Sequence, residues 1–226
     1  MERYNEKKKI MIWVETIFDI SYLLTVLIVA GFLYHTAEIG SLRWQYSLMA
    51  FTLGIGDAFH LIPRIYSMVD RKNRDHTALL GIGKYVTSLT MTLFYLFLWD
   101  IGKNYYSFEV NMFYSVIVYG LALLRVLLCV LPHNRWLDKN PPFIWGIFRN
   151  IPFFILGMMV MVLYMIGSFR IGGNLSFLWL AILISFLCYL PVVLYSNRNP
   201  KIGMLMLPKS CAYVAIVLMG FVLPSV

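Results

Sequence analysis

Charged residues are scarce in this sequence. They make up 13% of its 226 residues, whereas 60% of the residues are hydrophobic, and the mean hydropathy is +0.73. An ordinary soluble domain carries about twice that charged fraction, so the composition excludes that class of protein. No stretch is long or polar enough to form a second domain, and we therefore expect one domain over residues 1–226.

Cysteine is also rare. The sequence has only Cys129, Cys188 and Cys211, each inside an apolar stretch. Their number is odd and their spacing is not that of metal ligands, so we expect free thiols rather than disulfides or a metal site.

Apolar residues are abundant, and they fall into runs of similar length. A helix of about 20 residues crosses the roughly 30 Å hydrocarbon core of a bilayer. Such runs predict an all-α integral membrane protein with seven transmembrane helices. The expected spans are about 11–34, 44–68, 77–99, 110–132, 144–167, 175–196 and 202–223.

Basic residues are distributed unevenly between the two sets of span ends. Because Lys and Arg collect in cytoplasmic loops, the bias places the N-terminus in the cytoplasm and the C-terminus outside. The net charge of +8 is mostly this bias, so we expect membrane lipids and no nucleic acid as partners. One set of ends carries Arg3, Lys7, Lys8, Lys9, Arg71, Lys72, Arg74, Arg135, Lys139, Arg198 and Lys201, and the other carries only Arg43, Lys103 and Arg170.

A short internal similarity links the first three spans to the last three. The string from His60 to Pro63 resembles the string from Cys188 to Pro191, and Lys84 and Lys209 occupy similar positions in their spans. With the fourth span between the halves, this is a parallel repeat in a 3+1+3 arrangement, as in transporters of the SWEET type. Chance similarity between apolar helices is the alternative.

Several ionisable residues lie inside the apolar runs, where an unpaired charge costs several kcal/mol. Glu15 and Asp19, at i and i+4, share one face of the first helix. Asp57, His60 and Arg64, at i, i+3 and i+7, share one face of the second. Such polar stripes should turn towards each other or towards a water-filled cavity.

Depths based on a rise of about 1.5 Å per residue place these charges in the cytoplasmic half of the membrane, with the deepest about 14–17 Å from the span ends. We therefore expect a polar cavity in that half, built by spans one, two, three, four and seven. The candidate ligand-binding or proton-coupling residues are Asp57, His60, Glu15, Asp19, Lys84, Arg125 and Lys209.

The basic residues admit simpler roles. Arg64 and Arg149 are shallow enough to reach lipid headgroups. Lys84 and Lys209 either pair with an acid of the first two spans or contact a ligand. Arg125 lies deeper and is expected to be paired inside the bundle, with Glu15 and Asp19 as its counter-charges.

Pro63 follows Asp57 and His60 in the second span. Its ring leaves the carbonyl of Phe59 without a helical hydrogen bond. Pro63 is either a hinge that exposes carbonyl groups to a ligand or a proline of the kind that membrane helices tolerate.

The balance of the buried charges favours an anionic ligand. If three acids and five permanent bases share one cavity, a phosphate or carboxylate completes the pairing. The leading hypothesis is binding or translocation of a small anionic or zwitterionic solute, with Asp57 and His60 as a proton-coupling pair, since histidine titrates near neutral pH.

The alternative is an intramembrane lipid-modifying enzyme of the hydrolase kind that uses Asp57 and His60. Seven-span hydrolases related to adiponectin receptors and alkaline ceramidases use a three-histidine zinc site, which His35, His60, His76 and His133 cannot assemble, because they lie at different depths. We therefore expect no metal and no cofactor. Whether there is turnover, and which residue would be catalytic, stays open, as does the oligomeric state.

The string GDAFHLIPRIY, from Gly56 to Tyr66, is followed by GIGKYVTS, from Gly81 to Ser88. These strings resemble those of small bacterial polytopic membrane proteins that share a GDAFH-x2-PR motif and have no activity attached to them. The resemblance implies a bacterial plasma-membrane protein with several spans, and it implies no substrate.

Overall fold

The computed structural model of this protein has helices and no strand among the residues that it describes. It describes residues 2–70, 74–107, 109–195 and 199–224, without the side chains of residues 2–9 and 200. Three basic residues of the orientation argument, Arg71, Lys72 and Arg198, lie outside it. The main helices are α1 (Glu2–His35), α2 (Leu42–Val69), α3 (Thr77–Tyr106), α4 (Met112–Val130), α5 (Phe143–Arg170), α6 (Leu178–Tyr195) and α7 (Met206–Leu218).

Within the described ranges, seven helical segments are long and apolar enough to cross a membrane, which confirms the predicted multi-pass architecture. The seventh segment is mixed, since 3-10 turns at Pro200–Leu205 and Met219–Val222 flank α7. Helix α3 extends beyond its predicted end at residue 99, and Lys103 pairs with Asp100 at 2.9 Å in the added segment. It stops where Ser107 adopts a left-handed conformation.

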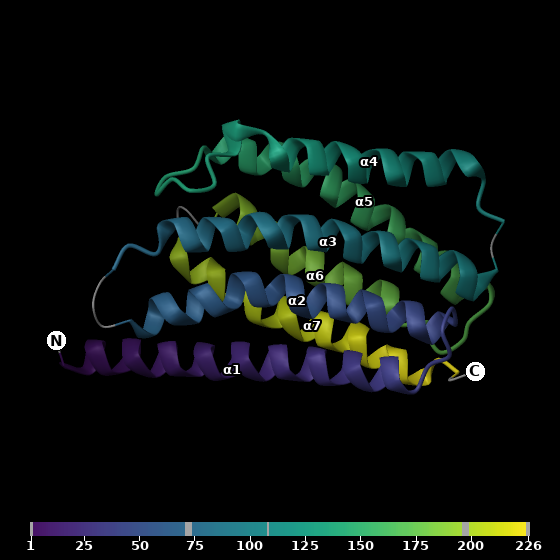
Figure 1. Ribbon diagram of the computed structural model, residues 1–226, viewed down its shortest axis with the longest axis horizontal. Coiled ribbons are helices and arrows are strands. Elements are labelled where there is room, and N and C mark those ends of the chain that lie inside the picture. Colours follow the sequence, from purple (N-terminus) through teal and green to yellow (C-terminus); the bar gives the residue numbers. More distant parts are fainter. Residues whose placement is uncertain (1, 71–73, 108, 196–198, 225–226) are drawn as a thin grey trace.

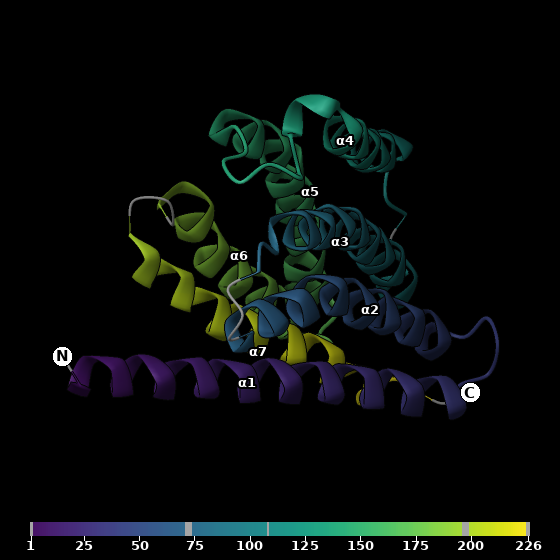
Figure 2. The same ribbon diagram turned by 60° about the vertical axis from the view of Figure 1, so that its left-hand side comes forward.

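The helices pack in two groups that follow the chain. Helices α1, α2 and α3 pack in sequence, as do α5, α6 and α7, and the groups meet where α3 contacts α5 and where α7 contacts α1. Helix α4 packs on α3 and α5 at the margin of the bundle, at the top of both views (Figure 1, Figure 2).

The two ends of the bundle carry different connections. The N-terminus and the connections α2–α3, α4–α5 and α6–α7 lie at one end, and the C-terminus lies at the other (Figure 1). We call the first the basic end, because its described residues include Arg74, Arg135, Lys139 and Lys201.

The α4–α5 connection folds back over the bundle at the basic end. The side-chain amide of Asn134, which is fully buried, donates to three main-chain carbonyls at the end of α4, at 2.6–3.2 Å. Trp136 donates from Nε1 to the carbonyl of Cys129 at 2.9 Å. The main chain at Trp136 lies so close to Gly81 of α3 that a Cβ there would overlap the Trp136 carbonyl oxygen.

Helices α2 and α3 approach closely beside the α2 proline. A Cβ at Gly83 would overlap the carbonyl oxygen of Phe59, the group that Pro63 leaves without a helical partner. Thr87 donates from Oγ1 to the carbonyl of Gly56 at 2.8 Å. Small residues and interhelical hydrogen bonds of this kind hold membrane helices together where the hydrophobic effect is weak.

The core away from the basic end is rich in aromatic residues. Tyr46, Phe94, Tyr95 and Tyr164 are fully buried. The Tyr164 hydroxyl crosses from α5 to the Leu98 carbonyl of α3 at 3.0 Å. Aromatic side chains therefore pack in the core of this half of the bundle, beside a space of about 720 Å³ that α3, α5 and the start of α4 line.

Candidate functional site

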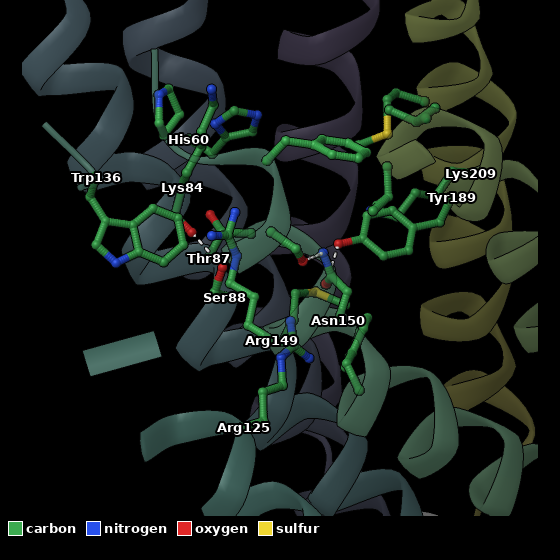
Figure 3. Close-up of a pocket in the computed structure, with 18 of the residues that line it drawn as sticks. His60, Lys84, Thr87, Ser88, Arg125, Trp136, Arg149, Asn150, Tyr189 and Lys209 are labelled. Atoms are coloured by element: carbon green, nitrogen blue, oxygen red, sulfur yellow. Dashed lines mark hydrogen bonds between the residues drawn. The ribbon is translucent and has the colours of Figure 1, made fainter. Parts of the chain in front are cut away.

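A cavity of about 310 Å³ lies at the basic end, where α2 to α7 and the α4–α5 connection meet. Four permanent cations and one histidine line it, and no described Asp or Glu does. We call it the basic cavity. The side chains converge on it from several helices (Figure 3). Its basic residues are His60, Lys84, Arg125, Arg149 and Lys209.

Arg149 is held in position in the wall of the basic cavity. Its Nη1 donates to Asn134 Oδ1 at 2.9 Å, and its guanidinium carbon lies 4.1 Å from the centre of the Trp136 ring. Both partners belong to the α4–α5 connection. Arg149 therefore faces the cavity.

Arg125 of α4 is the most deeply buried base among the described side chains, with 2% of its surface exposed. Its guanidinium carbon lies 3.4 Å from the centre of the Phe153 ring. Nε and Nη1 have no hydrogen-bond partner among the described residues. The predicted pairing with Glu15 or Asp19 is wrong, because α4 packs on α3 and α5, away from α1.

Lys209 of α7 sits between two tyrosines. Its ammonium lies 5.2 Å from the centre of the Tyr189 ring and 4.7 Å from that of Tyr213. Tyr189 is itself fixed by donating to Asn150 Oδ1 at 2.8 Å. The sequence predicts that Lys84 and Lys209 either pair with an acid or contact a ligand. Neither lysine forms an ion pair with a described acid, and both line the basic cavity.

The acids lie in a second, smaller space of about 50 Å³ beside the basic cavity, between α1, α2, α3 and the seventh segment. We call it the acidic pocket. Arg64 forms an ion pair with Glu15. Tyr22 donates to Asp57 Oδ2 at 2.6 Å. The acids that line the pocket are Glu15, Asp19 and Asp57.

The two spaces share a wall. His60 and Lys209 line both of them, together with Thr87 and Met206. His60 and Asp57 lie on the same face of α2, as their spacing predicts. No hydrogen bond joins these two side chains, and His60 Nδ1 is buried without a partner in the described part of the chain.

The structure therefore divides the single cavity that the sequence predicts. The prediction that spans one, two, three, four and seven build it is wrong for the larger space. Helix α1 reaches only the acidic pocket, because α1 packs on α2 and α7. Helices α5 and α6 line the basic cavity instead, through Arg149, Asn150, Phe153 and Tyr189.

Several residues that line the basic cavity were not predicted from the sequence. Trp136 lies in a connection and resembles an ordinary interfacial tryptophan, and Phe153 and Tyr189 resemble packing residues. One feature did point to α5: Gly146, Arg149 and Phe153 recur at the spacing of one helical face. Pro63 lines neither space, and the Phe59 carbonyl packs on Gly83, so the hinge stays a prediction.

The side chains available for a metal are dispersed. The described ranges hold no group of three His, Cys, Asp or Glu residues placed to bind a metal ion together. Comparison of the chain with protein-family models, with curated proteins and with solved structures finds no match. Any functional argument therefore depends on the site itself.

Proposed function

We propose that this protein binds a small anionic solute in the basic cavity and that it works as a transport or binding protein of the bacterial plasma membrane. One observation carries the proposal: four permanent cations surround a cavity of about 310 Å³ that no described acid lines. A zwitterionic solute fits where its anionic group faces these cations.

The electrostatics favour an anion strongly. At an effective dielectric constant of about 20, two unit charges 4 Å apart interact by about 4 kcal/mol. The cations of the empty cavity repel one another by energies of this order, whereas a phosphate or carboxylate among them attracts each one. Arg125 and Arg149 bring planar guanidinium groups, which suit the oxygens of such anions.

The walls add a requirement for shape. Trp136, Phe153 and Tyr189 present aromatic rings, and Val192 and Val193 of α6 present aliphatic surface. Binding sites for small molecules commonly combine apolar walls with a few placed polar groups. A ligand with an anionic group and a short apolar part matches both features.

Access is expected from the cytosol. The basic cavity lies at the basic end, and loops rich in Lys and Arg are typically cytoplasmic. At the inner wall of the cavity, aromatic rings pack edge to face, with Tyr95 and Phe153 at 5.2 Å and Phe94 and Tyr213 at 5.7 Å between ring centres. Translocation would require this layer to open.

The predicted 3+1+3 repeat is compatible with transport. Helices α1–α3 and α5–α7 form two groups of three, and α4 lies at the margin. Parallel repeats with a central site occur in some transporters. The repeat and the orientation of the N-terminus remain part of the proposal.

The alternative, an intramembrane lipid-modifying enzyme, has less support. General acid–base catalysis needs groups within reach of one reacting atom. Asp57 and His60 both line the acidic pocket, but that space is only about 50 Å³, and Asp57 already accepts a hydrogen bond from Tyr22 there. The geometry thus favours binding over catalysis.

Thermal unfolding of the purified protein in detergent tests the proposal. We expect potassium sulfate to raise the melting temperature above that in potassium chloride of equal ionic strength. Sulfate at about ten times its dissociation constant stabilises by about 1.4 kcal/mol, which corresponds to roughly 3–5 °C for a chain of this size.

Two substitutions make the test specific. Arg149→Gln removes a cation of the basic cavity and should abolish most of the shift. Arg170→Gln removes an arginine at the opposite end and should leave it unchanged. Equal shifts in both variants, or none in the wild type, would refute the proposal.

A further inference from the structure

Asp19 in the acidic pocket is an unusual carboxylate. Only 5% of its surface is exposed, and its buried Oδ2 has no hydrogen-bond partner among the described residues. Buried polar oxygens almost always have a partner. This oxygen therefore points to a ligand or a proton.

The groups around Asp19 have a negative net charge. Glu15 lies on the same helix, and Glu15 is paired with Arg64 of α2. Asp57 of α2 and Lys209 of α7 also line the pocket, and Tyr22 donates to Asp57. With His60 neutral, three carboxylates face two permanent cations, so one positive charge is missing.

The missing charge is better supplied by a proton than by a metal ion. The space is only about 50 Å³, and the carboxylates of the described ranges do not converge as a metal-binding group. A proton needs one oxygen, and Asp19 Oδ2 provides it.

We propose that Asp19 takes up one proton when an anion occupies the basic cavity, so that the acidic pocket couples anion binding to proton binding. The inference rests on the proposed function. A proton from the bulk buffer forms the O–H bond on Oδ2, and no other bond changes.

Lys209 provides the physical link. Its ammonium lines both spaces. While the basic cavity is empty, its other cations, Lys84, Arg125 and Arg149, add their positive field to that of Lys209 and offset the missing charge, so Asp19 stays ionised. An anion in the basic cavity compensates that field, which leaves the acidic pocket more negative and favours a proton there. The coupling is reciprocal, so a proton on Asp19 also favours the anion.

Proton uptake in weakly buffered solution tests the inference, with sulfate as the probe because it carries no exchangeable proton near neutral pH. A pH indicator follows the addition of potassium sulfate to the purified protein, against potassium chloride of equal ionic strength. We expect the wild type to take up as much as one proton per sulfate bound. Asp19→Asn should bind sulfate without uptake, whereas His60→Gln should keep its uptake per sulfate bound.

Each other outcome overturns a distinct statement. If sulfate binds to the wild type without proton uptake, the coupling is wrong and anion binding stands. If uptake disappears in His60→Gln and persists in Asp19→Asn, the proton is on His60. If binding requires sodium in place of potassium, the acidic pocket is a sodium site. If sulfate does not bind at all, the proposed function fails as well.

A second measurement covers the case in which Asp19→Asn does not fold. Infrared difference spectra of the wild type on sulfate addition should show the carbonyl band of a newly protonated carboxylic acid. Asp19→Glu keeps a carboxyl group and should shift the frequency of that band. An unshifted band, or no band, contradicts the assignment to Asp19.

Discussion

At the scale of single residues, the basic cavity depends on side chains that orient its cations without being charged themselves. Asn134 and Trp136 hold Arg149, and Tyr189 and Tyr213 flank Lys209. Cation–π contacts of this kind stabilise by about 0.5–2 kcal/mol each. They leave the N–H donors of the cations free to reach a ligand.

Substitution of Trp136 tests this orienting role. Trp136→Phe keeps an aromatic face for Arg149, and we expect its sulfate affinity to stay near that of the wild type. Trp136→Leu removes the face and should weaken sulfate binding about 2–5-fold, equivalent to about 0.5–1 kcal/mol. Both variants lose the Nε1 hydrogen bond to Cys129 equally, so equal affinities in titrations of the two would show that the ring does not position Arg149.

The sequence predicted part of the site at this scale. Spacing alone placed Glu15 with Asp19, and Asp57 with His60, and the structure brings these four to one pocket. Spacing gave no information on Arg125, because its environment depends on which helices α4 contacts. Depth alone left lipid headgroups open as the partner of Arg149, because the apolar runs do not show that the α4–α5 connection folds back onto it.

At the scale of elements, close approach of α2 and α3 fixes the shared wall between the two spaces. His60 and Thr87 lie in this wall, and Gly83 packs on the Phe59 carbonyl one residue before His60. Apolar run length predicted most of the span boundaries to within a few residues, but not the end of α3. The contact at Gly83 was not, because a glycine in a span is equally compatible with lipid exposure and with close packing.

Two glycine substitutions test the packing. Gly83→Ala places a Cβ against main-chain atoms of α2 and should lower the free energy of unfolding by about 1–3 kcal/mol. Gly120→Ala is the control, because a Cβ there meets nothing within 4 Å, and it should change stability by no more than about 1 kcal/mol. Thermal unfolding in the same detergent measures both. Similar melting temperatures would mean that α2 and α3 can separate at this point without cost.

At the scale of the whole molecule, polarity runs along the bundle. Basic connections, the basic cavity and the acidic pocket lie towards one end, and the buried core of the other half is largely aromatic. The sequence predicted this asymmetry from the depths of its charges. It did not predict the separation of acids from bases. That separation arises because α1, which carries Glu15 and Asp19, packs on α2 and α7, whereas α5, which carries Arg149, lines the basic cavity.

The expected orientation can be measured by cysteine labelling in intact cells. In a variant without the three native cysteines, Ile39→Cys lies between α1 and α2, and Lys139→Cys lies between α4 and α5. We expect a membrane-impermeant maleimide to label Ile39→Cys directly and Lys139→Cys only after permeabilisation. The reverse pattern would place the basic cavity on the outer side.

The most direct measurement of the central claim is the position of a bound anion. Crystals grown with selenate, a sulfate analogue, can be recorded at the selenium absorption edge. The account predicts an anomalous peak inside the basic cavity, in contact with Arg149 and Lys209. Peaks confined to bases outside the cavity, such as Arg170, with no peak inside it, would contradict the account.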